Sequence, residues 1–352
     1  MFLHALATAV PPAVFTQAEC WEIIQRSSVK ERLSRRTLRI LRTILKGDSG
    51  VQMRHFALPE IEGVFDLTSD QLNAAFRAEA PPLAGRALTA ALAQGGAVAG
   101  EIDALLVCTC TGYLCPGVSS YVAEQLGLRT DVFLQDLVGL GCGAAIPMLR
   151  AAQAVLAAKP DAVVACVAVE ICSAAFYLDD DPGVLISACL FSDGAAASIW
   201  RSTPGPGRWR CHGFDTLHLP VERDRLRFEQ RDGKLRNLLD PAVPKLAADA
   251  VSRLLAAERA RAGERPIRRI IAHHGGRDVL NALEAALPGY SLAASRRVLR
   301  DFGNMSSPSV LFALAEAMRD GQPDADGDWW LVSFGAGFSA HACRFGVAPV
   351  RD

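Results

Sequence analysis

The sequence predicts an α/β protein whose strands are buried between layers of helices. Short runs such as "AVVACVAV" at 162–169 are wholly apolar, which is typical of strands covered on both faces. These runs alternate with alanine-rich or amphipathic stretches that carry helix signals, and such alternation favours an α/β class with a parallel or mixed sheet. Half of the 352 residues are hydrophobic, which is enough for one large globular unit or two fused halves.

The N-terminal part is expected to begin with a strand in "MFLHALATAVPP". Thr16 with Glu19 three residues later is the signature of a capping box, so a helix should start there. The run "ERLSRRTLRILRTILKG" predicts one helix with a basic face that ends at Gly47. Further strands are expected within 102–112, 131–141 and 161–173, and a short helix within 119–128.

The segment "STPGPGRW" at 202–209 is a cluster of glycine and proline. It predicts a boundary between two halves, residues 1–203 and residues 204–352. Strand and helix signals then repeat. The second half should contain a long helix within 239–263, a strand within 265–276, a serine-capped helix within 306–321 and a final pair of strands within 328–347.

Composition excludes several functions. The formal net charge of -1 argues against a nucleic-acid-binding surface. The apolar runs are far shorter than the roughly 20 residues that span a bilayer, so no integral membrane segment is expected. The ten cysteines show no zinc-binding spacing, so we expect a reduced, cytoplasmic protein without a metal site.

One cysteine lies where a strand is expected to give way to a helix. Cys142 stands between Gly141 and Gly143 in "DLVGLGCGAA". The field of a helix N-terminus favours the thiolate and lowers a cysteine pKa, and free amides there can hold an oxyanion. A lone cysteine in such a place is more often a packing residue, so a catalytic interpretation requires partners.

Two partners occur later in the chain. His273 and His274 follow an expected strand in "IIAHHGG", and Asn304 lies in "DFGNMSSPSV" just before a helix. Taken alone, the histidines could be structural and the asparagine could be a turn residue or an N-cap. Together with Cys142, each at the end of an element beside glycine, they predict a Cys–His–Asn site.

These motifs carry a family resemblance that runs nearly end to end. "LLVCTCTGYLCPG", "DLVGLGCGAA", "EICSAAF", "LFSDGAAASIW", "AHHGG", "GNMSSPSVLFAL" and "SFGAGF" follow in order. The chain resembles type III polyketide synthases, chalcone-synthase-like members of the thiolase superfamily. The resemblance implies a layered αβαβα fold of two similar halves, no metal or redox cofactor, and a homodimer in which Cys115 approaches the partner's cavity.

The resemblance also implies roles for individual residues. Cys142 would accept the acyl group as nucleophile, with His273 and Asn304 as the other catalytic residues. Phe191 matches an aromatic gatekeeper between the CoA tunnel and the inner cavity. His274 stands where many members carry proline. A thiolate–imidazolium pair would serve thioester exchange, and the histidine and asparagine would hold the enolate formed when malonyl-CoA loses CO₂.

The substrates implied are an acyl-CoA starter and malonyl-CoA. Arg54 is the first candidate for binding the CoA phosphates. Arg39, Arg42 and Lys46 are weaker candidates, because a solvated basic helix face is the better interpretation of those three.

The pocket residues favour a long aliphatic starter. The positions that line the pocket in relatives are Cys110, Thr111, Cys172, Ala175 and Ser306. Several hydroxyl residues of the plant pattern are Cys or Ala here, which makes the pocket more apolar. The segment resembles bacterial alkylresorcinol and alkylpyrone synthases, so we expect a fatty acyl-CoA starter. Ser333 and Ala336 replace a glycine and a proline of the family's scaffolding loop, which could shift the mode of ring closure.

Three alternatives stay open from sequence. One is a tetrahydroxynaphthalene-type synthase that uses malonyl-CoA alone. A second is a ketoacyl synthase III-like enzyme whose extender is held on an acyl carrier protein. The third, outside the enzymes, is an inactive thiolase-fold subunit that acts as a dimer partner; the intact Cys142, His273 and Asn304 count against it.

Overall fold

The computed structural model describes residues 1–58, 60–261, 265–321 and 327–348. A nine-stranded mixed sheet in the order β11-β12-β13-β8-β1-β7-β6-β4-β5 organises them. Its two parts join where β1 pairs with β8 through Phe2 and Arg210. The strands are β1 (Phe2–Ala9), β4 (Ala104–Cys108), β5 (Phe133–Leu137), β6 (Val164–Glu170) and β7 (Gly194–Arg201) in one part, and β8 (Trp209–His218), β11 (Ile267–Ala272), β12 (Asp328–Gly335) and β13 (Ser339–Val347) in the other.

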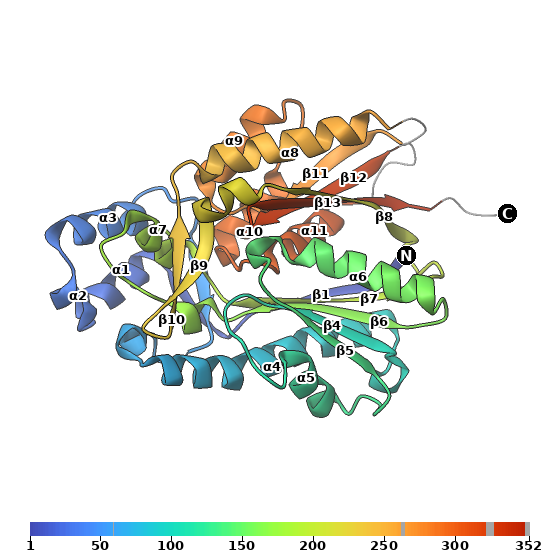
Figure 1. Ribbon diagram of the computed structural model, residues 1–352, viewed down its shortest axis with the longest axis horizontal. Coiled ribbons are helices and arrows are strands. Elements are labelled where there is room, and N and C mark those ends of the chain that lie inside the picture. The colour runs from blue at the N-terminus through green and yellow to red at the C-terminus, as the bar shows by residue number, and fades with distance from the viewer. Residues whose placement is uncertain (59, 262–264, 322–326, 349–352) are drawn as a thin grey trace.

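Helices cover both parts of the sheet and fill the space between them, as Figure 1 shows. The outer helices on the side of β1 are α4 (Ser69–Gly95) and α5 (Val118–Leu126); those on the side of β8 are α8 (Val243–Arg259) and α9 (Arg277–Ala286). Between the two parts lie α6 (Ala145–Ala158) and α11 (Ser309–Asp320), with α10 (Ala293–Phe302) beside α11. This is the layered αβαβα arrangement expected from the resemblance. Each interface between layers holds its own apolar core.

The remaining elements gather at one end of the molecule. They are α1 (Gln17–Arg26), α2 (Val29–Arg32), α3 (Arg35–Lys46) and α7 (Pro182–Leu190), with the two-stranded sheets β2 (Ala13–Thr16)–β3 (Met53–Phe56) and β9 (Leu226–Arg231)–β10 (Lys234–Leu239). The capping box at Thr16 is confirmed, because its side chain accepts from the backbone of Glu19 and Glu19 accepts in return.

Two predicted helices differ from the structure. The single helix expected over 31–47 is broken: α2 ends at Arg32, and Ser34 caps α3 by accepting from the Thr37 backbone, because a serine competes for backbone donors inside a helix. The helix expected to carry a serine cap is α11, and it begins after Pro308 without a side-chain cap. The hydroxyl of Ser306 instead contacts Cys142, as described below.

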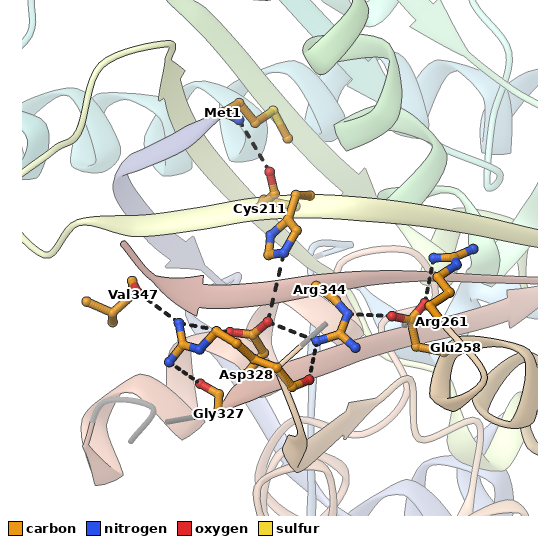
Figure 2. Close-up of polar contacts among 10 residues, drawn as sticks. Met1, Cys211, Glu258, Arg261, Gly327, Asp328, Arg344 and Val347 are labelled. Carbon is orange, nitrogen blue, oxygen red and sulfur yellow. Dashed lines mark hydrogen bonds and ion pairs between the residues drawn. The ribbon is translucent and has the colours of Figure 1, made fainter. Parts of the chain in front are cut away.

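A buried ionic cluster ties β12, β13 and α8 together (Figure 2). The Arg344 guanidinium donates to Asp328 at 3.0 Å and also to Glu258. All three side chains are at most 3% exposed. Arg265 lies 3.3 Å from the Asp328 carboxylate and Arg261 2.7 Å from that of Glu258. The carboxylates are therefore compensated within the protein rather than by water.

We expect Arg344→Met to lower the free energy of unfolding by about 3–5 kcal/mol, because it leaves two buried carboxylates short of their shared cation. Chemical denaturation measures this directly. The control is Arg319→Met, whose side chain is 69% exposed beside Glu316 and should change stability by less than about 1 kcal/mol. Equal losses in the two variants would contradict the structural role of the cluster.

Candidate active site

Cys142 lies in a tight turn between β5 and α6. The turn Gly141–Gly143 is a single 3₁₀ turn, and Gly141 has a φ of +55°, a conformation that favours glycine. The backbone of Gly335 packs directly against it. A β-carbon at Gly335 would lie 2.5 Å from the Gly143 nitrogen and 3.0 Å from the Cys142 nitrogen. This close approach thus requires a glycine at position 335.

His273 and Asn304 reach the same place from the other half of the sequence. His273 follows β11, and its backbone nitrogen donates to Val332 at 2.8 Å. The side-chain nitrogen of Asn304 donates to the Gly275 carbonyl at 2.8 Å, and its oxygen accepts from the Ser306 nitrogen at 2.8 Å. Cys142, His273 and Asn304 all line one cavity of about 860 Å³. The structure therefore brings the three predicted residues together.

The hydroxyl of Ser306 bridges two thiols. It donates to the Cys142 sulfur at 3.2 Å and lies 3.2 Å from the Cys110 sulfur. Ser306 has a φ of +58°, which is uncommon for a residue with a side chain and stores strain. The family resemblance placed Ser306 in the pocket lining, but the sequence gave no sign of this contact with Cys142.

Burial controls the ionisation of both groups. It raises the pKa of the Cys142 thiol to about 12, against the smaller lowering effect of the Ser306 hydrogen bond. Burial also lowers the pKa of the His273 imidazole to about 3. The expectation that a helix field lowers the thiol pKa is therefore wrong for the resting site. Cys142 lies in a short turn two residues before Ala144, the N-cap of α6, and desolvation is the largest influence on its pKa.

Glu170 is a buried neighbour that the sequence analysis missed. Its side chain is fully buried at the end of β6. One oxygen accepts from the Thr109 and Thr111 hydroxyls and from the Cys110 and Thr111 nitrogens at 2.8–3.1 Å, and the other accepts from Ser307. Burial raises its pKa. A glutamate that ends a wholly apolar strand was the available signal, since a buried carboxylate must be hydrogen-bonded.

A second, much smaller recess lies beside the large cavity. It has a volume of about 20 Å³, and five of the predicted substrate-binding residues line it: Thr111, Cys172, Ala175, Phe191 and Ser306. Phe191 lines both the recess and the large cavity. Cys110, the sixth, reaches this region through its contact with Ser306.

The structure does not fit the prediction that Arg54 binds the CoA phosphates. Its side chain is 3% exposed, and its guanidinium donates to the carbonyls of Ala188 and Phe191 at 2.7 and 3.1 Å. A guanidinium that is held in this way inside the protein cannot reach the phosphates of a CoA in solvent. Arg54 instead fixes the end of α7 next to Phe191. The weaker candidates Arg39, Arg42 and Lys46 are exposed on α3.

No group of three or more His, Cys, Asp or Glu side chains in the described part of the chain could hold a metal ion. None of the described helices is both long and apolar enough to cross a membrane.

Two family models together span most of the chain. Residues 11–208 match the model described as FAE1/Type III polyketide synthase-like protein, and residues 219–343 match the C-terminal domain of chalcone and stilbene synthases. The chain belongs to the type III polyketide synthase family. Enzymes of this family are acyltransferases that act on CoA thioesters without a further cofactor.

Two individual relatives and one solved structure show how similar the chain is to known members of the family. A 1,3,6,8-tetrahydroxynaphthalene synthase of Streptomyces peucetius subsp. caesius is 33% identical over 96% of this chain and 90% of its own length. A 3,5-dihydroxyphenylacetyl-CoA synthase of Streptomyces toyocaensis is 28% identical over 78% of this chain and 74% of its own. The crystal structure of the tetrahydroxynaphthalene synthase of Streptomyces coelicolor A3(2) is 25% identical and superposes with a TM-score of 0.86, covering 99% of this chain and 100% of that one.

We expect His273→Ala to slow alkylation of Cys142 by iodoacetamide at pH 7 by about 10²-fold, the low end of the effect of a general base. Without the imidazole, the thiolate must form by itself against the raised pKa of about 12. The rate in the variant should then rise about tenfold per pH unit up to at least pH 10, because the thiolate fraction does so below the pKa.

Peptide mapping by mass spectrometry separates Cys142 from exposed Cys115. The control His4→Ala changes a histidine on β1 outside the cavity and should keep the wild-type profile. Identical pH profiles for wild type and His273→Ala would show that this imidazole does not take the thiol proton.

Proposed function

We propose that this type III polyketide synthase uses malonyl-CoA as both starter and extender and forms a small polyhydroxylated aromatic product of the tetrahydroxynaphthalene type. The observation that carries the proposal is the shape of the site. Cys142, His273 and Asn304 share one open cavity of about 860 Å³, whereas the recess behind Phe191 has a volume of about 20 Å³. Such a recess holds about one water molecule, so it has no room for a long alkyl chain.

The first step would load Cys142. Its thiol proton moves to His273 as the sulfur attacks the malonyl thioester carbonyl. The bond between that carbonyl carbon and the CoA sulfur then breaks, and the leaving CoA sulfur takes the proton from the imidazolium. Because burial disfavours each isolated charge, the transient thiolate and imidazolium are favoured only as a pair.

The second step would generate the nucleophilic carbon. The bond between the carboxylate and the α-carbon of a further malonyl-CoA breaks, and CO₂ leaves. The electron pair of the broken bond stays with the α-carbon and forms an enolate with the thioester carbonyl. Asn304 has one side-chain hydrogen bonded to the Gly275 carbonyl, which leaves its second hydrogen for the enolate oxygen beside His273. A single donor of this kind is typically worth about 10²–10³ in rate.

The third step would join the two groups. The enolate carbon attacks the thioester carbonyl on Cys142, the new carbon–carbon bond forms, and the thiolate leaves. The product is a chain two carbons longer on CoA, ready for recapture. Holding both groups in one cavity supplies much of the barrier reduction.

A long-chain fatty acyl starter with an alkylpyrone or alkylresorcinol product is the second candidate. One observation favours it. A further apolar recess of about 20 Å³ lies behind the first, lined by residues such as Ile23, Leu41 and Phe65, and the two share Phe176 and Ala188 as a wall. Movement of Phe176 would join them into a channel toward α1 and α3.

The test is product analysis with labelled malonyl-CoA alone and with added palmitoyl-CoA. We expect an aromatic product from malonyl-CoA alone, loss of that product in Cys142→Ala, and less than a tenth as much palmitoyl-primed product. Phe176→Ala should raise the palmitoyl-primed yield at least tenfold by joining the recesses. Leu178→Ala is the control, because that side chain lines the second recess without separating it from the first. Predominant palmitoyl-primed product in the wild type would instead establish the second candidate.

We also propose that the enzyme is a homodimer joined along β5. This strand forms an edge of the sheet, and an apolar edge strand is a ready pairing surface. Phe133, the first residue of the strand, and Val138, which follows its last residue, are 52% and 50% exposed. Tyr113 in the loop that contains Cys115 is 70% exposed. The free state of all ten cysteines supports a reducing, cytoplasmic location.

We expect wild-type protein to elute as a dimer in size-exclusion chromatography with light scattering, and Phe133→Asp to elute as a monomer because a buried unpaired carboxylate is costly. Val221→Asp is the matched control, since Val221 is 86% exposed away from β5. A wild-type monomer, or a dimer in Phe133→Asp, would exclude this interface.

A further inference from the structure

The imidazole of His273 lacks the orienting partner that a catalytic histidine usually has. A base that activates a nucleophile is commonly held in place by a third group, which hydrogen-bonds its other ring nitrogen. The Nδ1 atom of His273 is buried, and no hydrogen-bond partner for it occurs among the described residues. Burial alone shifts the pKa of this imidazole, so no carboxylate in that part of the chain takes the orienting role. Another contact must therefore hold the ring at the cavity wall.

Two aromatic rings make that contact. The ring of His274 stacks on the ring of His273, with centroids 5.3 Å apart and an angle of 28° between the planes. Phe334, on β12, meets the same imidazole edge to face, with centroids 5.1 Å apart and an angle of 67°. Both separations lie in the range of favourable aromatic pairs. His273 is thus held by one ring from its own loop and one from the neighbouring strand.

His274 has no polar contact that explains its place. Its side chain is 0% exposed, and neither of its ring nitrogens has a hydrogen-bond partner among the described residues. Burying a polar group unpaired costs free energy that an apolar side chain would not cost. His274 also does not line the large cavity that contains Cys142. The ring contact with His273 is therefore the interaction through which His274 can act on the chemistry.

A neutral ring in this position suits a protonated neighbour. Burial, and then the nearness of His273, lower the pKa of His274 well below its usual value, so its ring stays neutral. The face of a neutral aromatic ring attracts a cation within about 6 Å of the ring centroid, most strongly where water is excluded. The two imidazole centroids are 5.3 Å apart. The stacked ring therefore offsets part of the cost of placing a positive charge on His273.

We propose that His274 is a positioning residue for the reaction: its neutral ring holds the imidazole of His273 at the cavity wall and stabilises it once it has taken the proton of Cys142. The inference rests on the proton transfer in the proposed function. No bond forms or breaks at His274, and the proton still passes from sulfur to His273 and on to the leaving thiolate. His274 raises the fraction of the thiolate–imidazolium pair, about tenfold if it raises the pKa of His273 by about one unit.

Alkylation of Cys142 by iodoacetamide between pH 6 and pH 10 tests the proposal without any malonyl substrate. Between the pKa values of His273 and Cys142 the fraction of the ion pair does not change with pH, so the rate stays level until free thiolate dominates at high pH. We expect His274→Leu, which keeps apolar bulk without the ring, to lower the level rate at pH 7 about tenfold. At pH 10 it should match the wild type within twofold, because free thiolate forms there without the imidazolium.

His274→Phe keeps a ring face without the nitrogens and should retain at least a third of the wild-type rate at both pH values. His274→Pro is a second variant without the ring, for use if His274→Leu does not fold by circular dichroism. It suits this position because the His274 backbone nitrogen donates no hydrogen bond among the described residues. The matched control is His55→Leu, which removes a histidine that stacks on Phe302 with centroids 5.8 Å apart, outside the cavity. It should keep the wild-type rates.

Three results would overturn the proposal. A wild-type rate at pH 7 in His274→Leu would show that the ring contributes nothing to the pair. An equal loss at pH 7 and pH 10 would mean that the substitution merely disturbs the site. A tenfold loss in His274→Phe as well would show that a ring face is not what His273 requires.

His273→Ala in the same series separates this inference from the proposed function. If His273→Ala loses rate at pH 7 and His274→Leu does not, the proton transfer stands and only the role of His274 fails. If neither variant loses rate, the transfer to His273 fails and the role of His274 fails with it. The identity of the polyketide product affects neither result, because alkylation does not depend on it.

Discussion

Burial of the Cys142 thiol and the His273 imidazole on one cavity is the constraint on which the chemistry depends. The pKa of the thiol is raised to about 12 and that of the imidazole is lowered to about 3, so each is neutral in the resting protein. A single charge in this place is costly. A proton moved from sulfur to nitrogen creates two opposite charges that stabilise each other in the same low-polarity surroundings. In the mechanism that we propose, the two groups would therefore ionise as a pair when an electrophile is present.

The fold serves this constraint by bringing the pair from opposite halves of the sequence. Cys142 follows β5 and His273 follows β11, strands at the two ends of the sheet order. The contact between the Cys142 turn and the backbone of Gly335 fixes one half against the other. At the far end of β12, Asp328 and its arginines anchor the same strand in a buried ionic cluster. Strand β12, against which the Cys142 turn packs, is thus held at both ends, which fixes the geometry of the site.

The features of the fold and of the site that could be predicted were those whose signal lies in a short stretch of sequence. The α/β class and the element order followed from the apolar runs and helix signals, whereas the αβαβα layers were implied by the family resemblance. The gathering of Cys142, His273 and Asn304 was expected from their places beside glycine and from the same resemblance. The helix break at Ser34 was missed because a serine can lie inside a helix or at its N-cap, and small local differences decide between the two. The pKa of Cys142 was misjudged because the helix field is visible in sequence whereas desolvation is a property of the whole fold. The same holds for Arg54, because only the packed structure shows that its guanidinium donates to two backbone carbonyls.

The faces of helix α3 show the same limit of prediction from sequence. Its 100° rotation per residue made a basic face predictable from the spacing of its arginines. The other two faces are both apolar, and sequence cannot distinguish a face that packs in a core from one that lines a cavity, because Leu41 and Ile44 are chemically alike. Only the placement of α7 and β10 opposite α3 leaves space along Ile40 and Ile44. A charged, exposed face and a face that lines the cavity therefore belong to the same helix.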